Sequence, residues 1–250
     1  MKQLLGAIRR ADQDFDLIQT GDRVCVGVSG GKDSLALLCA LALYRRFAPR
    51  PFELEAVTVS LGLEPFDLSG VTALCGRLGV PYTVEETQIG PIVFEQRREK
   101  NPCALCAKMR RGALVSVCQK RGLNKLALGH HRDDAIETLM LSVLQEGRMA
   151  TLQPATRLEG SGVTQIRPLI YAPEKDIRHV VRAMDLPVVP SPCPANGETR
   201  RADMKALLRQ ICAVAPDARE KIAAALKNDA RYALWAKPQK EGPDRSAGAE

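Results

Sequence analysis

The chain has 250 residues, which is enough for one large domain or for one domain with a small appendage. Apolar residues make up 45% of the chain and charged residues 26%, a composition that excludes a largely disordered protein. The formal net charge of +7 favours a polyanionic partner. No apolar run reaches the roughly 20 residues that span a membrane, and the N-terminus lacks a signal-peptide core, so we expect a cytoplasmic protein without a membrane partner.

Predicted helices and strands alternate along the chain. In order, we predict a helix over 1–20, a strand over 22–29, a helix over 34–46, a strand over 52–61, a helix over 68–80, a strand over 81–87, an irregular segment over 88–102, a helix over 104–121, a strand over 124–130, a helix over 132–145, a strand over 164–170, a helix over 173–185, an extended segment over 186–190 and a helical region over about 199–235. This alternation predicts an α/β fold with a parallel sheet and helices on both faces. Ligands of such sheets bind beyond the carboxyl ends of the strands.

A glycine-rich sequence, SGGKDS, stands between the first predicted strand and the following helix. Glycines allow the backbone to approach an anion closely, and the helix N-terminus adds its dipole. Lys32 adds a positive charge and Ser34 a hydroxyl. A Walker P-loop would need glycine in place of Val26 and serine or threonine in place of Asp33, so that motif is excluded. We therefore predict a different site for a phosphate chain, formed by Ser29, Gly30, Gly31, Lys32, Asp33 and Ser34.

The SGGKDS loop resembles the pyrophosphate loop of N-type ATP pyrophosphatases, also called PP-loop enzymes. The resemblance implies a three-layer, Rossmann-like fold of the adenine nucleotide alpha hydrolase type, with short helical extensions at both ends. It also implies that ATP adenylates an acceptor oxygen and that pyrophosphate leaves. We expect an N-terminal helix over 1–21, a PP-loop ATP pyrophosphatase domain over 22–195, a C-terminal helical region over 196–236 and a disordered tail over 237–250.

Histidines and aspartates gather in a second stretch, GHHRDDAIET, which follows another predicted strand. An aspartate here can cap the helix that begins at this point. Carboxylates can also hold Mg²⁺ against the phosphates of ATP, and a histidine can move a proton. Candidate nucleotide-binding residues are Gly129, His130, His131 and Asp134. Candidate catalytic residues are Lys32, Asp33 and Asp134.

Three of the eight cysteines stand in predicted loops or at a helix start. Cys103 and Cys106 form a CxxC pair that can share a metal or act as a redox pair, and Cys193 lies in a proline-rich loop. Three such thiolates suit an iron–sulfur cluster with one open iron, although simple buried thiols stay an alternative. The remaining cysteines are expected to be small core residues: Cys25, Cys39, Cys75, Cys118 and Cys212.

Taken together, five segments resemble the tRNA 2-thiocytidine synthetase family: SGGKDS, CALCAKMRRGAL, LALGHHRDDAIETL, IRPLIYAPEKDI and SPCP. The resemblance implies that ATP adenylates the C2 oxygen of a cytidine in the anticodon loop of tRNA and that sulfur then displaces AMP. It implies ATP, Mg²⁺ and a 4Fe-4S cluster as cofactors. Cys103 and Cys106 would ligate the cluster, and Cys193 would be its third ligand or a catalytic thiol.

Basic residues follow the CxxC pair, and they are expected either to contact RNA phosphates or to form a solvated helix face. They are Lys108, Arg110, Arg111, Lys120 and Arg121, with Arg200 and Arg201 placed similarly after Cys193. Expected partners are tRNA, a sulfur donor (a cysteine desulfurase or inorganic sulfide) and a second copy in a homodimer. Two alternatives stay open: a cluster-free, lysidine-synthetase-like enzyme acting on tRNA, and a zinc-dependent RNA-binding protein.

Overall fold

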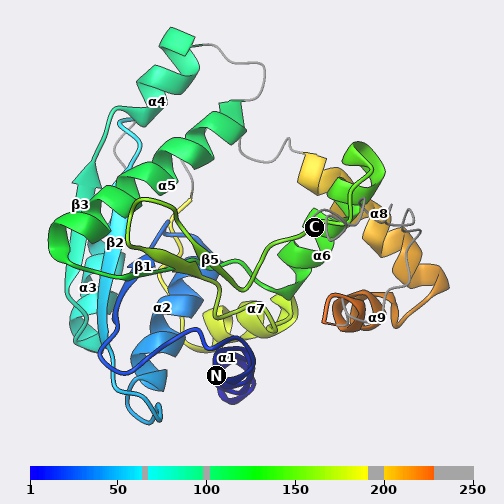
Figure 1. The fold of residues 1–250 in the computed structure, drawn as a ribbon, viewed down its shortest axis with the longest axis horizontal. Coiled ribbons are helices and arrows are strands. Elements are labelled where there is room, and N and C mark those ends of the chain that lie inside the picture. The colour runs from blue at the N-terminus through cyan, green and yellow to red at the C-terminus, as the bar shows by residue number, and fades with distance from the viewer. Residues whose placement is uncertain (64–66, 98–101, 191–199, 228–250) are drawn as a thin grey trace, which may run out of the picture.

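A six-stranded sheet forms the centre of the computed structural model, which describes residues 1–63, 67–97, 102–190 and 200–227 (Figure 1). The strand order is β3-β2-β1-β4-β6-β5. Neighbouring strands are parallel except for β5 and β6, which are antiparallel. The strands are β1 (Arg23–Gly27), β2 (Glu53–Ser60), β3 (Tyr82–Glu86), β4 (Lys125–Ala127), β5 (Ala155–Arg157) and β6 (Thr164–Ile166). The predicted α/β fold with a parallel sheet is confirmed.

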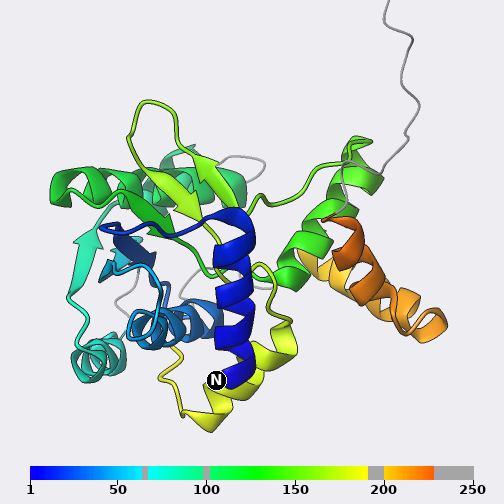
Figure 2. The same cartoon turned by 60° about the horizontal axis from the view of Figure 1, so that its bottom comes forward.

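Helices cover both faces of this sheet and give it three layers (Figures 1 and 2). Side chains of β1 alternate between two cores: Val24 and Val26 pack toward α1, α2 and α7, whereas Cys25 packs toward α5. The helices are α1 (Lys2–Phe15), α2 (Lys32–Tyr44), α3 (Ser69–Leu78), α4 (Ile89–Pro91), the π-helix η1 (Ile92–Arg97), α5 (Pro102–Arg121), α6 (Arg132–Glu146), α7 (Glu174–Ala183), α8 (Arg200–Val214) and α9 (Ala218–Ala225). None of these described helices has both the length and the apolar character needed to cross a bilayer.

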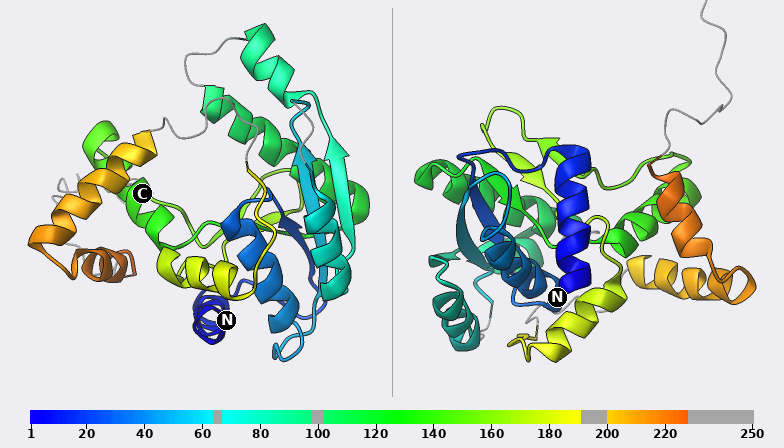
Figure 3. Two further views of the ribbon diagram at one scale, coloured as in Figure 1. Left: turned by 180° about the vertical axis from the view of Figure 1, so that it is seen from behind. Right: turned by 90° about the horizontal axis from the view of Figure 1, so that it is seen from below.

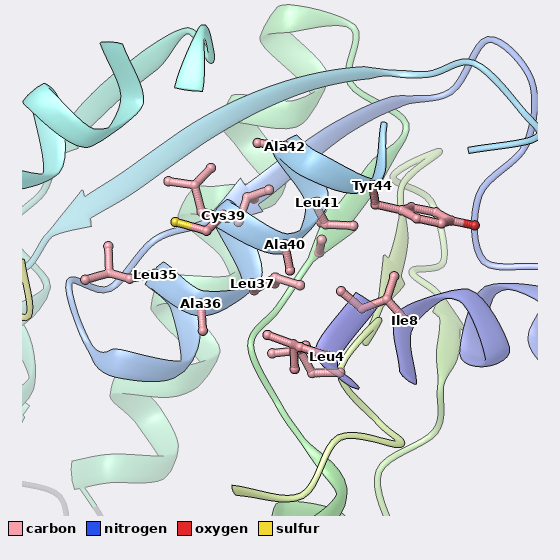
Figure 4. Close-up of a cluster of buried hydrophobic side chains, with 14 of the residues drawn as sticks. Leu4, Ile8, Leu35, Ala36, Leu37, Cys39, Ala40, Leu41, Ala42 and Tyr44 are labelled. Atoms are coloured by element: carbon pink, nitrogen blue, oxygen red, sulfur yellow. The ribbon is translucent and has the colours of Figure 1, made fainter. Parts of the chain in front are cut away.

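The helix after the glycine-rich loop is the most buried helix of the fold (Figure 4). Every residue from 35 to 42 is at most 4% exposed, because α2 lies between the sheet, α1 and α7. Leu4 and Ile8 of α1 pack on it, and Tyr44 at its end donates a hydrogen bond of 2.8 Å to Asp12 of α1. This packing fixes the position and direction of the loop that precedes α2.

Three predictions of secondary structure are wrong. Residues 89–97 are helical rather than irregular, because Pro91 falls in a first helical turn, where a missing N–H costs no hydrogen bond. Strand β5 was not predicted, since all three of its residues are exposed and it has no apolar pattern. The C-terminal helical region is interrupted at 215–217, around Pro216, and α8 and α9 pack with α6 to one side of the sheet (Figure 3).

Candidate functional site

The direction of strand addition reverses at β1, which has β2 on one side and β4 on the other. The loops that leave the carboxyl ends of β1 and β4 therefore diverge around a crevice, where ligands of such sheets bind. The SGGKDS loop follows β1, and the GHHRDD stretch follows β4. The fold brings the two predicted nucleotide-binding segments to one place.

Hydrogen bonds within the SGGKDS loop hold it in a tight curve. The backbone N–H of Ser29 donates to Oγ of Ser34 (3.1 Å), and this hydroxyl donates to the carbonyl of Gly31 (2.9 Å). Gly30 has a φ of +78°, a backbone conformation that favours glycine. Gly31 caps α2, so the first N–H groups of that helix have no intrahelical partner and can bind an anion.

A cavity of about 320 Å³ lies beside this loop. That volume is within the range of about 300–1,000 Å³ typical of small-molecule sites. Predicted residues that line it are Ser29, Asp33, Ser34, Gly129, His130 and Asp134, together with Arg110 and Arg111 of α5. Gly30, Gly31, Lys32 and His131 belong to the same loops but are not among the described residues that line the cavity.

Lys32 stands at the first position of α2 with its ammonium group between two carboxylates. Its Nζ is 2.8 Å from both carboxylate oxygens of Asp33 and 3.0 Å from Oε1 of Glu174. Burial disfavours the charged amine, but these two acidic partners outweigh burial and raise the pKa of Lys32. The loop therefore carries a fixed positive charge. Glu174 was not predicted as a site residue, although it lies in the IRPLIYAPEKDI segment.

His131 and Asp134 form a reciprocal cap at the start of α6. The backbone N–H of His131 donates to Oδ2 of Asp134 (2.9 Å), and the N–H of Asp134 donates to Nδ1 of His131 (3.4 Å). A proton on the neutral imidazole ring therefore sits on Nε2, which lies 3.6 Å from Oδ1 of Asp33. The capping interpretation holds for Asp134, which also lines the cavity.

Cys103 and Cys106 occupy the first turns of α5, the helix whose Arg110 and Arg111 line the cavity. Cys103 is exposed and Cys106 is 8% exposed. Their spacing places both on one face of the helix. Ala107, next to Cys106 in the chain, lines the cavity, whereas Cys103 and Cys106 are not among the described residues that line it.

The third candidate ligand, Cys193, lies outside the described residues. Within the part of the chain that the structure describes, no group of three or more His, Cys, Asp or Glu side chains could hold a metal. The predicted ligation by Cys103, Cys106 and Cys193 would therefore need Cys193 in addition to the two cysteines of α5.

The other cysteines separate into two groups. Cys25, Cys39, Cys75 and Cys118 are buried, as predicted. Burial, together with the neighbouring Cys75, raises the pKa of the Cys39 thiol to about 11, so it stays protonated and packs as a small apolar group. Cys212 is only half-buried, and the prediction that it is a core residue is wrong, because α8 packs on α6 at the side of the fold.

Replacing Gly129 with alanine is expected to lower the affinity for ATP about tenfold or more, because small displacements in such sites have large effects. An added Cβ would lie 3.0 Å from the carbonyl carbon of Asp33 and from the backbone N of Ser34, atoms that cannot move without shifting the loop. Equilibrium binding of ATP tests this. Gly76→Ala is the control, because its Cβ would meet nothing within 4 Å. Equal affinities in the two variants would contradict the prediction.

Comparisons with known proteins agree with this geometry. The PP-loop domain family matches residues 5–210. A tRNA-cytidine(32) 2-sulfurtransferase of Geobacter sulfurreducens is 39% identical over 93% of this chain and 92% of its own length. The enzyme of that name from Pelobacter propionicus is 39% identical over 91% of this chain and 86% of its own length.

One solved structure shares the fold. The U34-tRNA thiolase NcsA from Methanococcus maripaludis, described with its 4Fe-4S cluster, superposes with a TM-score of 0.73 at 23% identity, over 89% of this chain and 76% of that one. The family match covers most of the chain, and the two relatives are 39% identical over at least 91% of it. The chain therefore belongs to the PP-loop domain family and, within it, to the family of the tRNA-cytidine(32) 2-sulfurtransferases.

Proposed function

We propose that this protein uses ATP to adenylate the C2 oxygen of a cytidine in the anticodon loop of tRNA and replaces that oxygen with sulfur, giving 2-thiocytidine. The observation that carries the proposal is that one cavity is lined both by the phosphate-binding loop and by the helix that bears Cys103 and Cys106. Adenylation of the oxygen and delivery of the sulfur must occur at the same atom of the base. A cavity lined by both the loop and α5 allows both steps at one bound nucleotide.

The phosphate-binding loop has the features that adenylation needs. An amide-like oxygen of a base leaves poorly, and transfer of AMP to it turns it into a good leaving group. The pyrophosphate released in that step gains negative charge as the bond to the α-phosphate breaks. Backbone N–H groups at the start of α2 and the charged Lys32 are placed to stabilise that charge, and fixed donors of this kind act most strongly in the transition state.

Two carboxylates of the cavity fit Mg²⁺, which prefers oxygen ligands. Asp33 and Asp134 both line the cavity, and each has an oxygen within 3.6 Å of Nε2 of His131. We propose that these two aspartates hold Mg²⁺ against the phosphates and that His131 keeps them in position. His130 lines the same cavity and is proposed to contact the nucleotide.

Thiol donors at the start of α5 fit a cluster that has three protein ligands. Cys103 and Cys106 would hold it. Cys193 is the proposed third ligand. Val189, which precedes Cys193 by four residues in the chain, donates a backbone hydrogen bond of 3.0 Å to the carbonyl of Gly30 in the phosphate-binding loop. When bound, a 4Fe-4S cluster supplies an open iron that can bind sulfur.

Arginine and lysine side chains on α5 give the proposed tRNA surface. Lys120 and Arg121 are engaged with Glu85 (3.6 Å) and Glu55 (2.7 Å), so the solvated-face interpretation fits them better. Lys108 and Arg111 are exposed, and Arg110 and Arg111 line the cavity. We propose that these three residues contact phosphates of the tRNA near the target nucleotide.

Replacing Arg111 with glutamine is expected to weaken tRNA binding several-fold and to reduce the slope of log affinity against log salt by about one, because one phosphate contact is lost. Binding of unmodified tRNA at several salt concentrations measures both quantities. Lys120→Gln loses the same charge on the same helix and is expected to leave the slope unchanged. An equal effect of the two substitutions would contradict the placement of the tRNA surface.

We further propose that the sulfur comes from a cysteine desulfurase or from inorganic sulfide, and that the protein acts in the cytoplasm. A homodimer would double the basic surface available to a tRNA.

Nucleoside mass spectrometry of tRNA from a deletion strain tests the proposed function. We expect 2-thiocytidine to disappear and to return when the gene is restored. An unchanged nucleoside profile would overturn the proposal. Loss of lysidine instead would favour the cluster-free alternative, and zinc in the purified protein together with no ATP turnover would favour the RNA-binding one.

A further inference from the structure

The carboxylate of Glu174 reaches Lys32 from a different helix than the carboxylate of Asp33 does. Asp33 is the next residue on α2, so its contact with Lys32 needs no tertiary structure. Glu174 begins α7, and its Oε1 comes within 3.0 Å of Nζ of Lys32 because α7 packs against α2. The lysine of the phosphate-binding loop is thus shared between a local carboxylate and a distant one.

Glu174 is held in place from several directions. Its backbone N–H donates to Oδ2 of Asp133 (2.8 Å), at the start of α6. Its Oε1 is 3.0 Å from Nη2 of Arg178, one turn further along α7, and 3.8 Å from Nζ of Lys205 on α8. These contacts come from three helices and fix both the backbone and the side chain of Glu174.

The charge of Glu174 is equally well fixed. Burial would raise the pKa of its carboxyl group, but the hydrogen bond and the charge of Lys32, with further contributions from Arg178 and Lys205, outweigh burial and lower the pKa to about 2. The carboxylate is ionised throughout the range in which the protein would be assayed. It therefore acts on Lys32 as a constant negative charge.

We propose that Glu174 is a positioning residue that holds the ammonium group of Lys32 from a second side, opposite the local partner Asp33. This inference rests on the function proposed above. Without Glu174, Lys32 would be held only by the two oxygens of Asp33, each 2.8 Å away, and its ammonium group would be free to follow that one side chain. With Glu174 present, a second carboxylate at 3.0 Å fixes where Nζ lies at the start of α2, beside the cavity that Asp33 lines. Glu174 does not line that cavity among the described residues, so it acts through Lys32.

A double-mutant cycle tests the proposal, with wild type, Glu174→Gln, Lys32→Met and the double variant compared. ATP-dependent AMP formation in the presence of tRNA and equilibrium ATP affinity are measured for all four proteins. We expect Glu174→Gln to lower kcat about tenfold and the affinity for ATP about threefold, because the positioned lysine contacts the phosphates in the bound state but matters most in the transition state. In the Lys32→Met background, Glu174→Gln is expected to have no further effect, since interacting residues are not additive.

The matched control is Asp176→Asn, which removes the same charge from the first turn of α7. It is expected to keep wild-type kcat. If Glu174→Gln lowers activity by the same factor in wild type and in Lys32→Met, Glu174 has a structural role and the proposal is wrong. Wild-type kcat together with wild-type ATP affinity in Glu174→Gln would also overturn it.

The two proposals fail in different ways. If wild type forms AMP but no 2-thiocytidine, the proposed function fails and the cycle still reports on Lys32. If wild type forms no AMP at all, the ATP affinities of the four proteins decide: an effect of Glu174→Gln that vanishes beside Lys32→Met supports the inference, and an effect that persists, or none, overturns it.

Discussion

Cys103→Ser is expected to abolish formation of 2-thiocytidine while leaving ATP affinity within about twofold of wild type. Cys103 is exposed, so the substitution removes a thiolate without removing a packed side chain. Loss of even an outer partner of a metal ligand costs 10- to 100-fold in metal affinity or activity, and loss of a ligand is expected to cost at least about 100-fold. Iron content, visible absorbance and thiolated nucleoside are the three measurements.

Two further variants sharpen this experiment. Cys106→Ser is expected to give the same loss of iron and of thiolation, with some loss of stability as well, because Cys106 packs in the core beneath α5. Cys212→Ser, on α8, changes a half-buried cysteine outside the proposed ligand set and is expected to keep iron and activity. Wild-type iron content in Cys103→Ser would contradict the proposed ligation.

Lys32→Met is expected to lower ATP-dependent AMP formation by about 10²- to 10³-fold, the usual cost of removing one group that stabilises transition-state charge. Methionine keeps much of the length and the apolar stem of lysine, so the main loss is the ammonium group between Asp33 and Glu174. Release of AMP in the presence of tRNA and ATP measures the effect.

Lys175→Met provides the control for Lys32→Met. It removes one positive charge from an exposed position next to Glu174 and so reproduces the change in net charge. We expect wild-type activity for it. Activity of Lys32→Met within about threefold of wild type would mean that backbone N–H groups alone hold the phosphates, contrary to the role assigned to Lys32.

The sequence was sufficient to predict the position of the SGGKDS loop because all of its parts are consecutive in the chain. Ser29, Gly30 and Gly31 stand between a buried strand and an apolar helix, and the structure has a tight loop at this position. The convergence of SGGKDS and GHHRDD also followed from the sequence, since both come after parallel strands whose carboxyl ends share one edge.

Contacts between distant segments could not be predicted in the same way. The approach of Glu174 to Lys32 depends on how α7 packs on α2, and a short motif carries no information on that packing. The close contact of Gly129 with the backbone of Asp33 and Ser34 could not be predicted either, because a glycine after a strand is also common in ordinary turns. Strand β5 was missed for a local reason, since three exposed residues leave no apolar signal.

The most direct test of the account is a reconstituted reaction. The purified protein, kept anaerobic with its iron retained, is incubated with unmodified tRNA, ATP, Mg²⁺ and sulfide, and AMP and nucleosides are quantified together. The account predicts 2-thiocytidine and AMP in equal amounts, both dependent on tRNA and on ATP. Formation of AMP without any thiolated cytidine, or thiolation that proceeds without ATP, would contradict it.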